Sequence, residues 1–260
     1  VVTLSPPNCP RDHRLPALDI GKHKLPVVNP VPSVMGMMRR SGDWSANNSS
    51  SLRLLTFCGE PLLPEHLDGI FRVLPDVVVH NTYGPTEATV SCSLLQLTKD
   101  TYHRHAKNSI ALGNAIEGTE FFIKDVNNYA AQSGELLIAG SQLADGYWMD
   151  SARTKESFKQ ISVNGREIVA YHTGDFVELD ATGLYFTERK DRQVKIKGHR
   201  VELNEISSHI RKLGYIHAET FFDGTAIIAL VEGEEQDDAL PEIRQYLDSR
   251  LESYMLPRRI

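Results

Sequence analysis

Apolar runs of strand length alternate with amphipathic stretches in the first half of the chain. Residues 52–57 and 77–81 predict strands, and residues 63–74 between them predict a helix. This alternation is typical of an α/β layer. The proline-rich residues 1–55 are expected to be irregular, apart from a helix near residues 32–38.

Further strand-like runs follow, and they predict an antiparallel β region with turns between the strands. These runs are residues 120–124, 134–139, 168–173 and 183–187.

The pattern changes again after residue 191. A hairpin is expected at residues 193–203 and a helix at 205–213. Two strands are expected within residues 218–231, and a final amphipathic helix at 237–254. They predict a separate, small α+β unit whose boundary lies near residue 190.

Composition places the chain among ordinary globular proteins. Its 260 residues are 41% hydrophobic and 24% charged, which is enough for a buried core. The net charge of −6 gives no reason to expect a nucleic-acid surface. No apolar run reaches the roughly 18 residues of a membrane span, and three cysteines without metal-type spacing favour a reducing compartment. We therefore expect a cytoplasmic protein with no membrane span and no nucleic acid as partner.

A polar turn follows the second predicted strand. Residues 83–87 are Tyr-Gly-Pro-Thr-Glu, in which Gly84 and Pro85 favour a turn. The turn carries an aromatic ring able to stack on a base, a hydroxyl, and a carboxylate suited to a hard cation. Open α/β sheets bind ligands at the carboxyl ends of their strands, where this turn is expected. A purely structural Gly-Pro turn is the alternative.

Four motifs follow one another along the chain. They are residues 81–89 (Asn-Thr-Tyr-Gly-Pro-Thr-Glu-Ala-Thr), 134–140 with Gly-Tyr-Trp at 146–148, 171–175 (Tyr-His-Thr-Gly-Asp) and 189–202. In this order they resemble the adenylate-forming superfamily, specifically the adenylation domains of non-ribosomal peptide synthetases and their stand-alone relatives. Residues 57–60 (Phe-Cys-Gly-Glu) resemble D-alanine–carrier protein ligases most, and stand-alone proline-adenylating enzymes are also similar.

The resemblance implies an α/β fold in two parts. Residues 1–190 would be a large N-terminal adenylation subdomain of mixed sheets and helices, and residues 191–260 a small α+β C-terminal lid. Both are expected to be incomplete, since the family's phosphate-binding loop would precede residue 1 and its terminal lysine would follow residue 260. The chain by itself is therefore expected to be inactive, because that lysine is the main cation that stabilises the transition state.

The resemblance also implies a nucleotide site. Tyr83 would stack on adenine, and Asn81 would hydrogen-bond the amino edge of the base. Asp175 would accept both ribose hydroxyls, a task suited to a carboxylate, and Arg189 would donate to ribose or phosphate. A turn residue and a surface ion pair are the alternatives for these last two. The other residues assigned to nucleotide binding are Gly59, Glu60, Pro61 and Thr82.

The catalytic residues implied are Thr86 and Glu87. Thr86 would contact the α-phosphate, and Glu87 would be the metal ligand that holds Mg²⁺ against the phosphates of ATP. Asp191 would be the hinge about which the lid rotates, with a plain loop residue as the alternative. Gly198 would let a phosphopantetheine arm pass close to the backbone, although the basic residues around it are also typical of a solvated hairpin.

A substrate pocket is implied by the same resemblance, lined by Asn29, Thr56, Cys58, Thr82, Val90 and Ser91. Cys58 would line it or be a buried small hydrophobe, and no chemical step requires it as a nucleophile. Glu188 departs from the family, which has glycine before the arginine that corresponds to Arg189. That departure leaves the path of the loop open.

These residues predict ATP- and Mg²⁺-dependent activation of a small amino acid (alanine, D-alanine or proline) and its transfer to the phosphopantetheine thiol of a carrier protein. An acyl- or aryl-CoA ligase shares the fold and the first step. A degenerate nucleotide-binding module without catalysis is the third interpretation.

Overall fold

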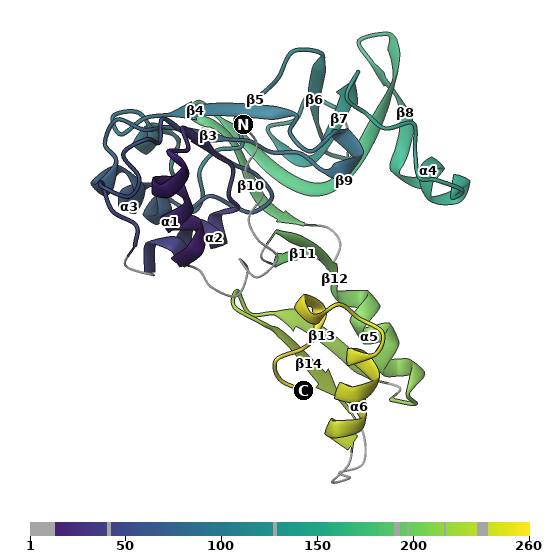
Figure 1. Cartoon of the computed structure of the whole chain (residues 1–260). Helices are drawn as coiled ribbons and strands as arrows, with labels where there is room; N and C mark the ends of the chain where they lie inside the picture. Colours follow the sequence, from purple (N-terminus) through teal and green to yellow (C-terminus); the bar gives the residue numbers. More distant parts are fainter. Residues whose placement is uncertain are drawn as a thin grey trace. The chain divides into compact units, whose positions relative to one another are not determined.

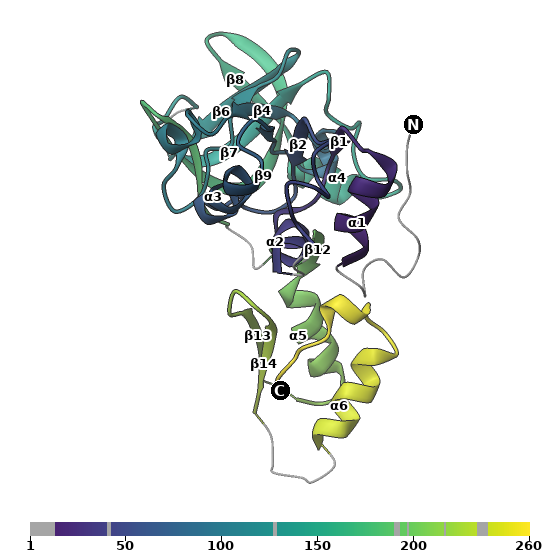
Figure 2. The ribbon, with the colours of Figure 1, turned by 60° about the vertical axis from the view of Figure 1, so that its left-hand side comes forward.

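The computed structural model describes residues 14–40, 43–126, 129–189, 193–196, 198–215, 217–232 and 239–260 (Figures 1 and 2). Contacts divide the chain into two compact units, Val1–Glu188 and Arg189–Ile260. The boundary predicted at residues 190 and 191 lies outside the described residues.

A mixed sheet organises the first part of the first unit. Its strands are β1 (Val27–Val28), β2 (Leu54–Phe57), β3 (Val78–Asn81), β4 (Ser93–Leu97) and β5 (Asn114–Ala115), in that order across the sheet. β1, β2 and β3 are parallel, and β4 and β5 continue the sheet in antiparallel pairing. The carboxyl ends of the parallel strands therefore meet at one edge, which is where α/β sheets bind ligands.

Helices α1 (Arg14–His23), α2 (Pro32–Arg40) and α3 (Pro64–Val73) contribute to the core of this sheet. α2 and α3 agree with the predicted helices to within two residues at each end. α1 contradicts the expectation that residues 1–55 are irregular outside α2. Ile20 explains the difference, because it is only 1% exposed, and burial of an apolar side chain stabilises a helix despite proline-rich surroundings.

Antiparallel strands form a second sheet in the order β10–β9–β7–β6, with β8 paired to β9. They are β6 (Thr119–Lys124), β7 (Ser133–Gly140), β8 (Phe158–Val163), β9 (Arg166–Asp180) and β10 (Gly183–Arg189), and α4 (Ser151–Ser157) precedes β8. The predicted antiparallel region is confirmed. Leu136, Ile138 and Val177 of this sheet pack with Tyr83 and Ala88 from the loop after β3. The second sheet thus forms a wall against the polar turn.

The second unit is a small α+β arrangement. Its described elements are β11 (Gln193–Ile196), β12 (His199–Glu202), α5 (Leu203–Lys212), β13 (Ala218–Phe222), β14 (Ile227–Val231) and α6 (Ala239–Asp248). The predicted hairpin is confirmed by the pairing of β11 with β12. α6 ends at Asp248, so the helix predicted up to residue 254 is too long. Leu251 reaches the core from the turn after α6, and Met255 reaches it from a short 3₁₀ helix, Ser253–Met255.

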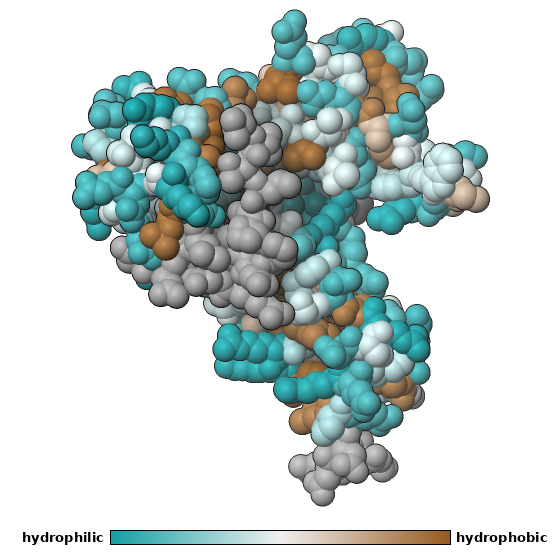
Figure 3. Space-filling view, in the orientation of Figure 1, coloured by the Kyte–Doolittle hydropathy of each residue, from teal (hydrophilic) through white to brown (hydrophobic). Residues whose placement is uncertain are grey.

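The mixed α/β fold predicted from the sequence is confirmed. None of the helices in the described part of the chain combines the length and the apolarity that crossing a membrane requires. On the face shown in Figure 3, apolar side chains form scattered patches among hydrophilic ones. Trp148 and Met149, in the loop before α4, are about as exposed as apolar side chains can be (90% and 91%).

Candidate functional site

The loop after β3 begins beside the end of β2. Thr82 donates to the carbonyl of Phe57 through both its backbone N–H (2.9 Å) and its hydroxyl (3.0 Å). The Thr82 hydroxyl lies 3.2 Å from that of Ser91, which donates to Cys58 Sγ (3.7 Å). Cys58 Sγ in turn donates to the carbonyl of Val90 (3.5 Å). Four residues predicted for the substrate pocket therefore form one group, the Cys58 cluster (Cys58, Thr82, Val90 and Ser91).

Asn29 and Thr56, predicted for the same pocket, lie at this edge of the sheet. Val28 of β1 pairs with Leu55 of β2, and Asn29 and Thr56 are the residues that follow this pair. Thr56 and Cys58 are two positions apart, the spacing at which side chains share one face of a strand. Asn29 is exposed and Thr56 is half-buried.

The backbone of the polar loop is strained next to the Cys58 cluster. Thr89 and Val90 have φ angles of +56° and +70°, a conformation that is unfavourable for β-branched residues. A Cβ on Gly84 would lie 2.6 Å from the carbonyl oxygen of Val90, so only glycine allows the two segments to approach this closely. Strain of this kind is common at ligand sites. Val90 is nevertheless 57% exposed.

Tyr83 reaches from the same loop to the second sheet. Its hydroxyl donates to Oδ2 of Asp175 at 2.5 Å, and the two residues are only 7% and 5% exposed. Burial of the phenol, and then the nearby Asp175 carboxylate, raises the pKa of Tyr83 well above its ordinary value. Tyr83 therefore remains a hydrogen-bond donor at neutral pH, and it holds the carboxylate predicted to bind ribose.

Asp175 lies in a bulge inside β9, not in a turn. Glu135 pairs with Phe176 and Leu137 with His172, so Leu136 alone faces residues 173–175. The Thr173 hydroxyl fills the bulge by donating to the Leu136 carbonyl (2.6 Å) and accepting from Asp175 N–H (3.0 Å).

Asn81, at the end of β3, is almost fully buried (4% exposed). Its Nδ2 donates to the carbonyl of Ala111 at 2.8 Å. This bond fixes the amide so that Oδ1 is the atom left to accept a hydrogen bond. An acceptor is what the amino edge of adenine requires, so the orientation fits the predicted role.

Glu60 holds the start of α2. Its two carboxylate oxygens accept from the backbone N–H (2.8 Å) and the hydroxyl (3.0 Å) of Ser33, which lies in the first turn of that helix, where a negative charge is stabilising. The side chain is thus engaged by Ser33. A role in the adenine wall would fall to the backbone of Glu60 and to Gly59 and Pro61, which follow β2 directly.

Thr86 and Glu87 lie in a 3₁₀ turn, Thr86–Ala88. Thr86 is exposed, as a phosphate contact must be, whereas Glu87 is only 7% exposed. Oε1 of Glu87 accepts a 2.6 Å hydrogen bond from the hydroxyl of Tyr147. The Tyr147 ring is itself held by the Arg153 guanidinium, 4.5 Å from its centre, and by an edge contact with Phe158.

Sequence reasoning placed Tyr147 within the second motif but gave it no role. The only signal in the sequence was that Gly-Tyr-Trp follows the Glu87 motif in the order that the family resemblance implies. The contact itself joins residues 60 positions apart, and nothing in the local sequence pattern indicates it.

Glu87 is a candidate ligand for a magnesium ion that is bound together with phosphate, rather than part of a site built from protein ligands alone. No group of three or more His, Cys, Asp or Glu residues in the described part of the chain could hold a metal. Mg²⁺ is usually bound by one or two carboxylates together with phosphate and water oxygens. A single carboxylate in the turn predicted to contact phosphate therefore fits Mg²⁺ bound with ATP.

The remaining predicted residues belong to β10 and the second unit. Arg189 is the last residue of β10 and is half-buried, and Gly198 lies exposed at the turn between β11 and β12. Asp191 lies outside the described residues.

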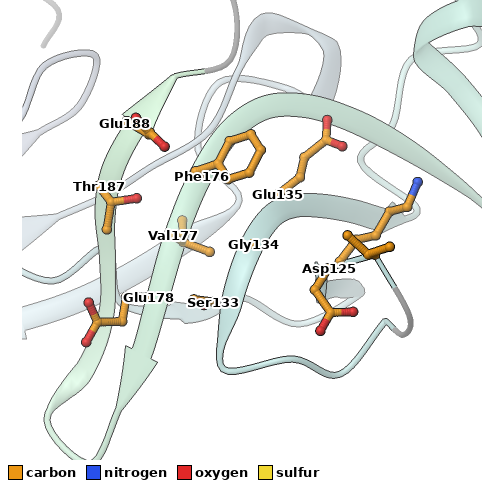
Figure 4. A pocket seen from close by; sticks show the side chains of 11 residues that line it. Asp125, Ser133, Gly134, Glu135, Phe176, Val177, Glu178, Thr187 and Glu188 are labelled. Carbon is orange, nitrogen blue, oxygen red and sulfur yellow. The ribbon is translucent and has the colours of Figure 1, made fainter.

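A separate cavity of about 520 Å³ lies beside β7, β9 and β10 (Figure 4). Phe176 and Val177 of β9 line it together with Glu135 of β7 and Glu188 of β10. None of the predicted site residues lines this cavity, and Asp175 is directed away from it toward Tyr83. The cavity is therefore distinct from the candidate nucleotide site, and Glu188, the departure from the family pattern, is located in it.

The fold and the ordered motifs are those of an adenylation domain, and comparison with known proteins agrees. A family model described as "AMP-binding enzyme" matches residues 1–148, more than half of the chain. The chain belongs to this AMP-binding enzyme family.

Curated relatives include a D-alanine–D-alanyl carrier protein ligase of Bacillus licheniformis, 32% identical over 243 residues, which cover 88% of this chain and 47% of the relative. A similar ligase of Staphylococcus epidermidis is 31% identical over 241 residues, covering 88% of this chain and 47% of that protein. This chain spans about half the length of the carrier protein ligases it matches.

Solved structures with the same fold include holo-PA1221, a non-ribosomal peptide synthetase protein with adenylation and carrier domains. Its TM-score is 0.82 at 27% identity, over 96% of this chain and 44% of that one. The adenylation domain AlmE of Vibrio cholerae, in complex with glycyl-adenosine-5′-phosphate, has a TM-score of 0.79 at 28% identity, over 94% of this chain and 48% of that one.

Proposed function

We propose that the full-length protein is an ATP-dependent ligase that activates a small amino acid as an aminoacyl adenylate and transfers it to the phosphopantetheine thiol of a carrier protein. One observation carries the proposal. The single loop after β3 contacts the buried carboxylate Asp175 through Tyr83, presents the carboxylate of Glu87, and forms the Cys58 cluster through Ser91. A ribose, a metal-bound phosphate and an acyl group would thus be held by neighbouring parts of one loop.

In the first step, the carboxylate of the amino acid attacks the α-phosphorus of ATP and pyrophosphate leaves. Asp175 accepts the ribose hydroxyls, and Thr86 binds the α-phosphate. Glu87 would hold Mg²⁺, which would neutralise charge on the phosphates when bound. Positioning and charge stabilisation are the whole of the protein's contribution, because no covalent intermediate with the chain is needed.

In the second step, the thiol of phosphopantetheine attacks the carbonyl of the mixed anhydride, and AMP leaves as the acyl group moves to sulfur. In our proposal residues 1–190 act as the adenylation subdomain and residues 191–260 as the lid, with Asp191 as hinge, Arg189 as a nucleotide contact and Gly198 beside the pantetheine arm.

The Cys58 cluster supports an uncharged substrate side chain. Hydroxyl and thiol groups meet there at one end of the sheet, without a charged group among them. The named relatives act on D-alanine or bind a glycyl adenylate, and they support the same class. The carrier proteins named for these relatives support a carrier protein as the acceptor of the activated amino acid. Localisation in the cytoplasm remains a prediction.

ATP–pyrophosphate exchange by the full-length protein tests the proposal. The panel contains glycine, both alanine enantiomers, proline, and fatty and aryl acids without an α-amine. Exchange promoted by one of the small amino acids supports the proposal. Exchange promoted only by acids without an α-amine would identify an acyl- or aryl-CoA ligase instead. Absence of exchange together with retained ATP binding would identify a nucleotide-binding module.

A further inference from the structure

A single carboxylate spans the bulge that carries Asp175. Oε1 of Glu135 accepts from the backbone N–H of Gly174, and Oε2 lies at the same distance, 3.2 Å, from Nδ1 of His172. His172 and Gly174 are the two neighbours of Thr173, so Glu135 bonds both flanks of the bulged residue. An ionised carboxylate only accepts, so in this arrangement Nδ1 of His172 carries the hydrogen.

The bulge needs this support because its backbone departs from the β ladder. Residues 173–175 all face Leu136, which leaves N–H groups without ladder partners. Gly174 has a φ of +72°, outside the range of a regular strand. Without Glu135, the N–H of Gly174 would lose a hydrogen-bond acceptor within the protein. Because Asp175 is the next residue along the chain, a change in the backbone at Gly174 would also move Asp175.

Glu135 lies on β7, where it borders the cavity of Figure 4 and projects toward the bend of β9. Its side chain is only 12% exposed. A carboxylate so far from water is retained only when hydrogen bonds replace its hydration, and the described bonds go to the two flanks of Thr173. The side chain thus contributes hydrogen bonds to both flanks of the bulge.

We propose that Glu135 is a positioning residue for nucleotide binding, which acts by holding the bulge of residues 173–175 so that the Asp175 carboxylate is presented to the two ribose hydroxyls. The inference rests on the proposed function, which assigns ribose to Asp175. Glu135 itself touches no part of the nucleotide.

A comparison of two nucleotides distinguishes a positioning role of Glu135 from a role in the stability of the protein. They are AMP and 2′,3′-dideoxy-AMP, which lacks both ribose hydroxyls. Both dissociation constants are measured by calorimetry without metal. Charge-assisted hydrogen bonds to two hydroxyls should make the wild-type protein bind AMP at least about tenfold more tightly than the dideoxy nucleotide. In Glu135→Ala, AMP affinity should fall to near that of the dideoxy nucleotide, and affinity for the latter should change less than about twofold.

Two further variants and a control complete the test. Glu135→Gln keeps an oxygen that accepts from Gly174 N–H, so it should restore most of the preference for AMP. Glu135→Met fills the same volume without an acceptor and should behave like Glu135→Ala, which covers the case in which alanine prevents folding. Glu120→Ala removes a carboxylate from the neighbouring strand β6, where it pairs with Arg166 at the surface, and should leave both constants unchanged.

The outcomes distinguish the inference from the function on which it rests. If Glu135→Ala and Glu135→Met keep the wild-type preference for AMP, or lose affinity for both nucleotides equally, Glu135 is only structural and the inference is wrong while the ribose assignment stands. A wild-type protein that binds both nucleotides equally would overturn the ribose assignment and the inference with it.

Discussion

The phenol of Tyr83 and the carboxylate of Asp175 are joined by a 2.5 Å hydrogen bond across 92 positions of sequence. The bond ties the loop at the end of β3 to the bulge in β9, and both partners are buried. Tyr83 therefore acts on the proposed ribose site by fixing one oxygen of Asp175. Its ring also packs in the core between the two sheets, so any contact with adenine would use the part of the ring that the core leaves free.

Replacement of Asp175 should weaken nucleotide binding more than replacement of Tyr83. Asp175→Ala removes the acceptor for both ribose hydroxyls, and the Michaelis constant for ATP in pyrophosphate exchange by the full-length enzyme should rise at least about tenfold. Tyr83→Phe keeps the ring and the carboxylate, so a rise of about threefold or less is expected from the lost hydrogen bond. An unchanged Michaelis constant in Asp175→Ala would contradict the ribose assignment.

Local patterns in the sequence were sufficient to predict the layers of the fold. The apolar runs of β2 and β3 and the amphipathic spacing of α3 lie where they were expected, because each of these elements buries one side in a core next to it. The order of the motifs also predicted that the Tyr-Gly-Pro-Thr-Glu loop and Asp175 belong to one site.

Tertiary contacts account for what the sequence did not predict. The run predicted as a strand at residues 168–173 continues as β9 to Asp180, because the hydroxyl of Thr173 and the carboxylate of Glu135 bridge the bulge. The amide of Asn81 and the carboxylate of Glu60 are each bonded within the protein, and neither bond follows from a local pattern. Tyr147 was missed for the same reason.

Two buried tyrosines should make the protein sensitive to alkali. Burial, and then the hydrogen bond to Asp68, raises the pKa of Tyr102 to about 12, and the pKa of Tyr83 is raised as well. The unfolded chain releases these protons from about pH 10, so the folded state binds more protons above that pH. The stabilising contribution is therefore complete below pH 10 and is lost as the pH rises toward 12.

Urea unfolding at pH 8, 9, 10 and 11 measures this effect. Tyr102→Phe removes one titrating group, so its free energy of unfolding should fall less steeply above pH 10 than that of the wild type, whatever its value at pH 8. Equal slopes for the two proteins would show that Tyr102 titrates alike in the folded and unfolded chains.

The two described cysteines should differ in reactivity. Burial, and then the neighbouring Cys58, raises the pKa of Cys92 to about 12, and Cys92 is inaccessible to solvent. Cys58 is half-buried at the open end of the sheet. Iodoacetamide at pH 8 should modify Cys58 at least about tenfold faster than Cys92, since the thiolate is the reactive form.

Protection by substrate turns this labelling into a test of the pocket. The amino acid that supports exchange, added with ATP, should slow the modification of Cys58, followed by mass spectrometry of the peptide that contains it. An amino acid that supports no exchange serves as the control. Equal labelling rates with and without the substrate would remove Cys58 from the acyl pocket.

Tyr147→Phe should impair magnesium use selectively. The variant keeps the ring between Arg153 and Phe158 but removes the hydroxyl that orients Glu87. A hydrogen bond to a charged group contributes about 1.5–3 kcal/mol, part of which is recovered by water in the variant. The Mg²⁺ concentration for half-maximal exchange should therefore rise about three- to tenfold, with the Michaelis constant for the amino acid unchanged.

A measurement without turnover separates metal binding from catalysis. Electron paramagnetic resonance of Mn²⁺ with the protein and a non-hydrolysable ATP analogue should show weaker metal binding in Tyr147→Phe by a similar factor. Trp148→Phe changes the adjacent aromatic side chain, which is exposed and holds no carboxylate, and should match the wild type in both experiments. If Tyr147→Phe binds Mn²⁺ as the wild type does, Glu87 is oriented without Tyr147, and the hydrogen bond between them serves only the packing of the loop before α4.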